Sequence, residues 1–293
     1  MSITINSNVP ALIARNALTR ATWSLNKSME RLSTGNRINS AADDPAGYYY
    51  ASGINSELRG TQTAYQNVAA GANMISLAEG DLSAINDQLE RIKDLATQYA
   101  NDSITDEERK AIKLEAQQRV DEIERIVEDS EFNKVKLLDG SKDGARLQIG
   151  AGSDAATNAI YVNGVFLNAS TGQDGIKLFG DGADQFADID AAFKDAESAS
   201  DFIDIVQASA DIVTERIATA GAYQARLESI SDNLLTKNEN LTAAYSTVME
   251  TDISTETANY VKNQILQQTA SSLLIQANQS SGIIALNLIG SLA

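Results

Sequence analysis

The sequence predicts a mainly α-helical protein whose long antiparallel helices, coiled-coil-like in their heptad spacing, carry one small β-hairpin module. Three observations predict this class. The chain has two prolines, Pro10 and Pro45, so no proline interrupts a helix after residue 45. Aliphatic residues recur at steps of three and four near both ends of the chain, whereas glycine-rich, β-prone sequence is confined to residues 132–185.

Residues 11–32 are expected to form the first helix. Their apolar positions fall on one broad stripe: Leu12, Leu18, Leu25, Met29 and Leu32. Residues 33–43 are small and polar, which is typical of a loop. Asp44 is expected to cap the next helix, with Pro45 at its first position, where a missing N–H group costs nothing.

The second helix is predicted over residues 45–100. Its inward positions follow alternating steps of four and three: Ile54, Leu58, Thr61, Tyr65, Val68, Ala72, Ile75, Ala78, Leu82, Ile85, Leu89, Ile92, Ala96 and Tyr99. Two successive steps of three around Ile75 resemble a coiled-coil stammer.

Residues 101–104 predict a turn, and Thr105 with Glu108 has the spacing of a capping box for a third helix ending near residue 129. Its inward positions are Ile112, Ala116, Val120, Ile123 and Val127. Its charged face is expected to be solvated: Glu107, Arg109, Lys110, Glu122, Glu124 and Arg125.

Residues 132–185 change character. Residues 147–149 predict a strand, and residues 160–162 and 165–167 predict a hairpin, because the intervening Asn163-Gly164 favours a type I′ turn. The acidic residues Asp181, Asp184, Asp188 and Asp190 follow, without the spacing of an EF-hand, so a solvated loop is favoured over a calcium site.

Helices resume from about residue 186, and a heptad pattern runs from Ile217 to Val248. A last helix is expected over residues 254–289. The simplest architecture folds the chain back on itself. It gives a terminal helical domain, residues 1–43 plus 252–293, and a second domain of long helices, residues 44–251, with the β module at its far end.

The last 31 residues, 263–293, carry no charged side chain in a chain of net charge −17. Their amides interrupt every apolar run, so the segment is too polar to span a membrane. Aliphatic ridges with amide spacers suit the interior of a protein assembly. The terminal helices therefore predict a polymerisation surface completed by copies of the chain, formed by Leu12, Leu18, Leu25, Leu32, Ile265, Leu266, Leu273, Leu274, Ile284 and Leu288.

Composition excludes several classes of function. The chain has no histidine and no cysteine, which removes His-dependent catalytic triads, thiolate metal sites and disulfides. No convergent acid–base pair is visible, so we expect no enzyme, metal or cofactor. The acidic balance argues against nucleic-acid binding. The opening residues lack the pattern of a Sec signal peptide.

Several motifs, in order, carry a resemblance that covers nearly the whole chain. They are residues 5–8 (INSN), 30–35 (ERLSTG), 37–44 (RINSAADD), 78–80 (AEG), 131–133 (EFN), 136–138 (KLL), 147–151 (LQIGA), 264–268 (QILQQ) and 276–279 (QANQ). The sequence resembles the bacterial flagellins, in a short form with little of the outer variable domain. The alternative is a hook–filament junction protein, which shares the terminal motifs and often has an Asp-Asp-Pro like residues 43–45.

The resemblance implies a subunit that polymerises into the flagellar filament, with its terminal helices in the inner tube. It also implies type III export to the cell exterior, an export chaperone on the C-terminal helix, and hook-associated and cap proteins as partners. A host Toll-like receptor is a further implied partner, contacting Arg91, Leu95 and Glu115. Residues 48–50, all tyrosine, depart from the small or aliphatic residues usual in the family, and we expect them to pack rather than bind a ligand.

Overall fold

A computed structural model describes residues 8–142, 144–180 and 186–290, with the side chains of 281–290 outside that description. The chain divides into two compact units. The terminal unit comprises Met1–Glu57 and Asn240–Ala293, and the middle unit comprises Leu58–Glu239. The division thus lies within two long helices, about a dozen residues from the predicted boundaries.

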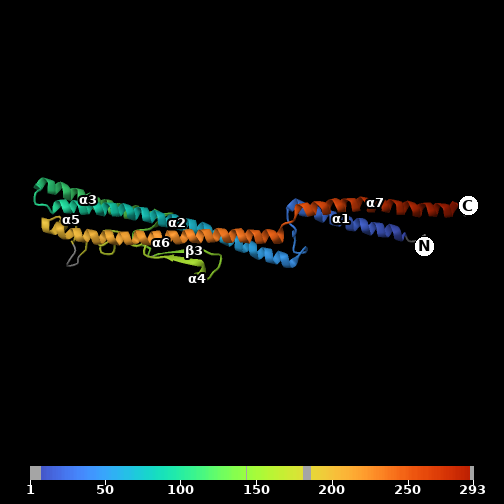
Figure 1. Ribbon diagram of the computed structural model, residues 1–293, viewed down its shortest axis with the longest axis horizontal. Coiled ribbons are helices and arrows are strands. Elements are labelled where there is room, and N and C mark those ends of the chain that lie inside the picture. Colours follow the sequence, from blue (N-terminus) through green and yellow to red (C-terminus); the bar gives the residue numbers. More distant parts are fainter. Residues whose placement is uncertain (1–7, 143, 181–185, 291–293) are drawn as a thin grey trace. The chain divides into compact units, whose positions relative to one another are not determined.

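Helix α1, Val9–Thr34 (Figure 1), has a capping residue at each end. The Asn8 side chain accepts a hydrogen bond from the Ala11 amide, and Pro10 lies in the first turn. At the other end Gly35 adopts φ +73°, and its amide donates to the Arg31 carbonyl. Glycine suits this left-handed position because a Cβ atom would strain the backbone there.

Helix α2, Pro45–Tyr99, confirms the second predicted helix. Asp44 caps it, since its carboxylate accepts a hydrogen bond from the Gly47 amide at 3.0 Å. The predicted inward positions from Ile75 to Tyr99 are all buried. Among the earlier ones Leu58 and Ala72 are half-buried, and the side chain of Tyr65 is exposed. The heptad spacing therefore predicts the core of α2 well on both sides of the stammer.

Helix α3, Asp106–Asp129, has the predicted capping box, with Thr105 and Glu108 each accepting a hydrogen bond from the other's backbone. Its apolar face packs into the core of the middle unit. Glu124, expected to be solvated, instead accepts hydrogen bonds from the amide and hydroxyl of Thr171. The prediction was wrong there because a loop far along the chain folds onto this helix.

The first hairpin joins β1, Glu131–Phe132, to β2, Val135–Lys136, as antiparallel strands. Its two turn residues, Asn133 and Lys134, have φ of +51° and +66°. Positive φ at both central positions is the mark of a type I′ turn. The predicted type I′ turn lies thirty residues later, at Asn163-Gly164.

The second sheet joins β3, Ala145–Gln148, to β4, Ala159–Val162, antiparallel, with Ala145 opposite Val162. The predicted hairpin of residues 160–162 with 165–167 is therefore wrong. Gly164 does take a positive φ of +80°, but Val165 and Phe166 beyond it are buried in the core. Burial of these two side chains outweighs the pairing that the Asn-Gly signal favours.

Short helices α4, Ala155–Asn158, and α5, Ile189–Ala192, precede the long helix α6, Ala196–Met249. In the middle unit α6 runs antiparallel to α2: Lys93 donates to Gln207, and Gln224 donates to Glu79. Aromatic rings close one end of this core, where Phe193 packs edge-on against both Tyr99 and Phe202.

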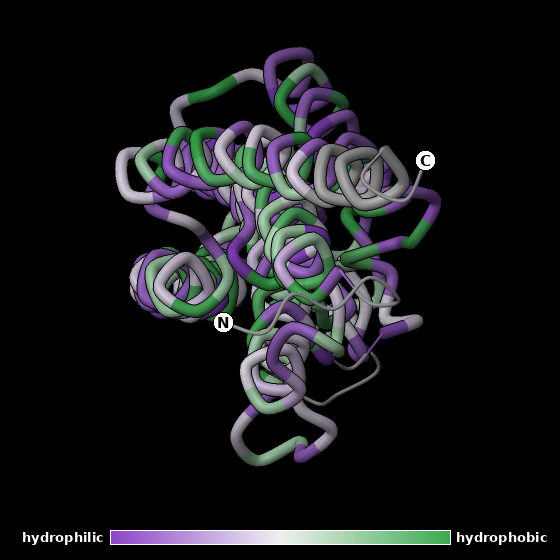
Figure 2. The backbone as a smooth tube through the Cα atoms, turned by 90° about the vertical axis from the view of Figure 1, so that its right-hand side faces the viewer, coloured by the Kyte–Doolittle hydropathy of each residue, from purple (hydrophilic) through white to green (hydrophobic). Residues whose placement is uncertain are grey.

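Helix α7, Ile253–Gly290, completes the terminal unit. Seen end-on, the helices show hydrophilic and hydrophobic residues mixed around their turns (Figure 2). In the part of the chain that the structure describes, no helix is long and apolar enough to cross a membrane.

Candidate assembly surface

Helices α1 and α7 pack against each other as an antiparallel pair. Three polar contacts fix their register: Asn8 Nδ2 donates to the Ala277 carbonyl, Gln267 Nε2 donates to Thr22 Oγ1, and Arg31 meets Glu256. The buried seam consists mostly of small side chains, namely Ala14, Ala21, Leu25, Ser28 and Ala270, together with Glu256. A seam of small residues brings the two backbones close but leaves the larger aliphatic side chains outside it.

The residues predicted to form the polymerisation surface divide into three groups. Leu12, Ile265, Leu266 and Leu273 are exposed, with Ile265 at 57% and Leu273 at 53%. Leu18, Leu32 and Leu274 are half-buried, and Leu25 is buried in the seam between the two helices. Ile284 and Leu288 belong to α7, but their side chains lie outside the described residues.

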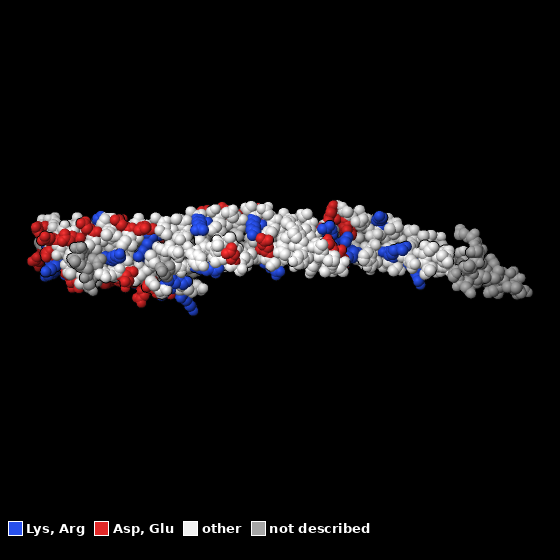
Figure 3. Space-filling view, turned by 90° about the horizontal axis from the view of Figure 1, so that it is seen from below, with Lys and Arg blue, Asp and Glu red and all other residues white. Residues whose placement is uncertain are grey.

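Further large apolar side chains are exposed on the same pair of helices: Val9, Ile13, Trp23, Met29, Ile253, Val261 and Ile275. An apolar groove of about 760 Å³ lies between the helices, lined by Ile13, Ala17, Leu266, Ala270 and Leu273 among others. In the space-filling view the pair is mostly white with scattered blue, apart from a group of red and blue atoms at its end near the connecting segments (Figure 3). Exposed apolar patches of this kind mark interaction surfaces in soluble proteins.

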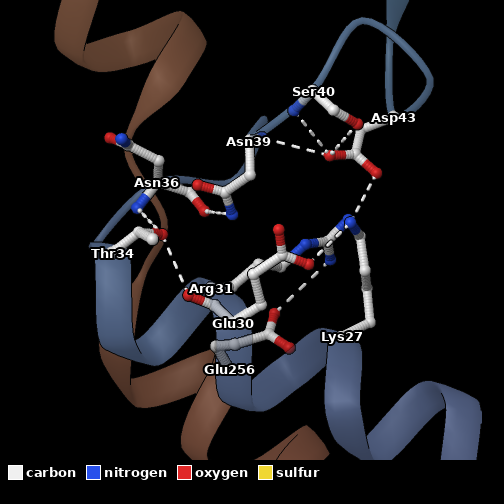
Figure 4. Close-up of polar contacts among 9 residues, drawn as sticks. All are labelled: Lys27, Glu30, Arg31, Thr34, Asn36, Asn39, Ser40, Asp43 and Glu256. Carbon is white, nitrogen blue, oxygen red and sulfur yellow. Dashed lines mark hydrogen bonds and ion pairs between the residues drawn. The ribbon is translucent and has the colours of Figure 1, made fainter.

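A polar cluster around Lys27, Glu30 and Asp43 links α1 to the segment that follows it (Figure 4). Lys27 Nζ lies 2.8 Å from Asp43 Oδ1 and 2.9 Å from Glu30 Oε2. The other oxygen of Asp43 accepts hydrogen bonds from the amides of Asn39 and Ser40. The Lys27 ammonium, followed by these amides, lowers the pKa of Asp43 to about 2, and Asp43 in turn raises the pKa of Lys27.

A second ion pair in this cluster joins α1 to α7. Arg31 Nη1 lies 3.6 Å from Glu256 Oε2, and the Glu256 side chain is almost fully buried (Figure 4). Nε of Arg31 is buried without a hydrogen-bond partner among the described residues. A buried carboxylate depends strongly on its cation, because it has lost the solvation that water would supply.

The two segments that connect the long helices are tied to each other. Asn36 and Glu250 form an antiparallel bridge, and the Thr251 amide donates to the Gly35 carbonyl at 2.9 Å. The Arg37 guanidinium donates to the Val248 carbonyl at 2.8 Å. The N-terminal and C-terminal connecting segments are therefore held together by both backbone and side-chain hydrogen bonds.

The acidic residues noted in the sequence have structural roles. Asp44 caps α2, Asp188 caps α5, and Asp190 pairs with Lys113 at 2.8 Å. Asp181 and Asp184 lie outside the described residues. Within the described ranges, acidic side chains do not gather into a group that could hold a metal ion.

The residues predicted to contact a receptor lie in the middle unit. Arg91 Nη2 is 2.8 Å from Glu115 Oε1, and this ion pair lowers the pKa of Glu115. Both side chains are partly exposed. Leu95 is only 1% exposed, because it packs into the core between the long helices. The side chain of Leu95 therefore lies beneath the surface that carries Arg91 and Glu115, and its predicted receptor contact stays a prediction.

Two long stretches of the chain match the models of one protein family. Residues 5–143 match the bacterial flagellin N-terminal helical region, and residues 203–286 match the bacterial flagellin C-terminal helical region. The chain belongs to the bacterial flagellin family. Flagellin is the subunit of the flagellar filament, a structural rather than enzymatic protein, so the function predicted from the sequence is confirmed and favoured over the junction-protein alternative.

Relatives of similar length match this flagellin nearly end to end. It is 33% identical over 288 residues to the flagellar filament 30.7 kDa core protein of Treponema maltophilum, covering 96% of this chain and 99% of that one. It is 34% identical to a flagellin of Halalkalibacterium halodurans, covering 94% and 96%. The alignment with a longer relative, polar flagellin F of Vibrio parahaemolyticus, has 29% identity, extends over 378 positions and covers 99% of this chain and 100% of that one. The short form expected from the sequence is thus confirmed.

The sequence did not reveal the Lys27–Asp43 and Arg31–Glu256 pairs. Its signals for them are weak, because a charge within an otherwise polar loop is usually solvated. The run of charges at residues 27, 30 and 31, facing residue 43 across a short loop, was the one local clue.

Proposed function

We propose that the α1–α7 pair is the main surface through which copies of this flagellin polymerise. The observation that carries the proposal is the exposure of eleven large apolar side chains among the described residues of these two helices in the single chain. When a neighbouring copy covers these side chains, the burial of apolar surface favours association by about 25 cal/mol per Å². Filament growth needs a contact that repeats from copy to copy without closing into a ring.

Charge supports the same assignment. The terminal unit carries 7 acidic and 6 basic side chains, whereas the middle unit carries 33 acidic and 17 basic ones. Copies can therefore pack their terminal helices together with little net repulsion, while the strongly acidic middle units favour solvent. This distribution also supports the predicted division into an inner helical domain and a surrounding one.

Polymerisation of the Ile265→Ser and Leu273→Ser variants tests the proposal. Both side chains are more than half exposed, so we expect the monomer to keep its thermal stability while the critical concentration for filament growth rises at least about tenfold. The matched control is Tyr161→Ser, an exposed position on β4 in the middle unit. Wild-type assembly by both α7 variants would overturn the proposal.

We further propose that α7 binds a dedicated export chaperone before the subunit leaves the cell by the flagellar type III route. Unpaired aliphatic side chains on α7, such as Val261 and Ile275, invite aggregation unless they are covered. We expect the chaperone to co-elute with the full chain and not with a chain lacking residues 254–293. Equal binding to both would contradict this. Hook-associated and cap proteins are proposed neighbours at the filament ends.

Recognition of the monomer by a host Toll-like receptor is proposed on Arg91 and Glu115, whose partly exposed ion pair is available to a partner. A reporter-cell assay of depolymerised protein would measure it. We expect a response that the double variant Arg91→Ala, Glu115→Ala reduces. No response to the wild-type monomer would refute the proposal.

A further inference from the structure

Three consecutive tyrosines lie near the start of helix α2 and are exposed on the surface of the terminal unit. Their side chains are 44%, 84% and 59% exposed at Tyr48, Tyr49 and Tyr50. None of the three hydroxyl groups forms a hydrogen bond with the described part of the chain. We expected these tyrosines to pack, and within a single subunit Tyr49 in particular packs against very little.

A shallow groove of about 510 Å³ lies beside them. Its lining includes Tyr49, Tyr50, Gly53 and Ile54 from α2, and Leu241 and Ala244 from α6. Ile54 is buried and forms part of the floor, while a Cβ atom added at Gly53 would meet nothing within 4 Å. Glu57 is the one charged residue in the lining. The groove is therefore open, largely apolar and bordered by aromatic rings.

We propose that Tyr48–Tyr50 and this groove form a contact with a second copy of the chain in the filament. The chain is a filament subunit, so the neighbours available to an exposed surface in the assembled state are identical copies. A tyrosine buries roughly 150–250 Å² when covered and keeps a polar tip that can find a partner. This contact uses none of the side chains assigned above to the α1–α7 surface.

Helical symmetry specifies the kind of contact further. A patch packs against its own twin only across a two-fold axis, whereas a growing filament uses heterologous contacts that pair two different surfaces. The tyrosine row of one copy therefore meets a different surface of the next copy. Two tyrosine rows do not face each other.

Thiol protection tests the contact directly. The chain has no cysteine, so Tyr49→Cys introduces a unique thiol, and Tyr161→Cys on β4 gives a control at an exposed position in the other unit. Monomers of both variants should react with a maleimide at similar rates. We expect filaments to slow the reaction at position 49 at least tenfold. An equal rate in monomer and filament at position 49 overturns the proposal.

Filling the groove gives a second test. Gly53→Leu adds a side chain where there is open space, and replacing glycine inside a helix favours helix formation. We expect a monomer at least as helical as the wild type whose critical concentration for assembly is raised at least about tenfold. Gly80→Leu, equally open and on the same helix, is the matched control. Wild-type assembly of Gly53→Leu would contradict an occupied groove, and this result is independent of the Ile265 and Leu273 variants.

Discussion

Among single residues, Asp43 gives a specific expectation for how the stability of the terminal unit depends on acidic pH. Its pKa is about 2 in the folded chain, below the ordinary aspartate value near 4, because Lys27 and two backbone amides stabilise the carboxylate. A depressed carboxyl pKa contributes stability that is present above the unfolded value and is lost as pH falls through the folded one. The raised pKa of Lys27 means that the stability from this ion pair is also lost when Lys27 deprotonates at strongly alkaline pH.

We therefore expect Asp43→Asn to lower the thermal stability of the protein at neutral pH. The gap between variant and wild type should narrow as pH falls from about 4 toward 2. Thermal unfolding followed by circular dichroism over that range measures the gap. Asp102→Asn is the control, because that carboxylate is almost wholly exposed. A gap that is constant with pH would show that the Asp43 charge does not matter.

Arg31 and Glu256 should respond unequally to substitution. Arg31→Ala leaves the buried Glu256 carboxylate without its cation, whereas Glu256→Gln removes the charge and keeps hydrogen-bonding atoms in place. We expect Arg31→Ala to cost about 1–3 kcal/mol and Glu256→Gln clearly less. Denaturant unfolding of both variants compares them. An equal or larger loss for Glu256→Gln would mean that the pair is not the source of the stability.

Among elements, the helices and the approximate positions of β3 and β4 could be predicted from sequence, and the pairing of the strands could not. The heptad repeats place α1, α2 and α3 to within a few residues, since a long periodic pattern averages over many side chains. Strand pairing depends on only a few residues and on the tertiary contacts that those residues form with distant parts of the chain. Gly164 has the positive φ that the Asn163-Gly164 pair predicts. The strand predicted after it does not form, because Val165 and Phe166 are buried in the core.

The turn at Asn133 and Lys134 gives a prediction at the scale of an element. Lys134 has φ of +66°, which disfavours a residue with a side chain by about 1 kcal/mol relative to glycine. Lys134→Gly creates the Asn-Gly pair preferred in type I′ turns. We expect it to raise the free energy of unfolding by about 1 kcal/mol. Gly164→Ala, also at positive φ, should do the reverse, and a destabilised Lys134→Gly protein would contradict the turn assignment.

The candidate assembly surface was partly predictable for a related reason. A stretch without charges, seen in residues 263–293, marks burial in an assembly regardless of detailed geometry. Which side chains face outward depends on the register between α1 and α7. That register buries Leu25 and leaves Leu12 exposed, and it rests on contacts hundreds of residues apart in sequence, such as that between Gln267 and Thr22.

For the whole molecule, the central claim is that the exposed apolar face of α1 and α7 becomes buried when copies polymerise. The chain contains one tryptophan, Trp23, which lies on α1 and is 68% exposed in the single subunit. Its fluorescence therefore reports on this surface without labelling or mutation. Filament formation can be verified in the same sample by electron microscopy.

The most direct measurement is Trp23 emission and acrylamide quenching in monomers and in filaments of the same preparation. The account predicts a shift of the emission to shorter wavelength and a several-fold fall in the quenching constant on assembly, because a neighbouring copy covers the indole. Filaments whose Trp23 emission and quenching equal those of the monomer would contradict it.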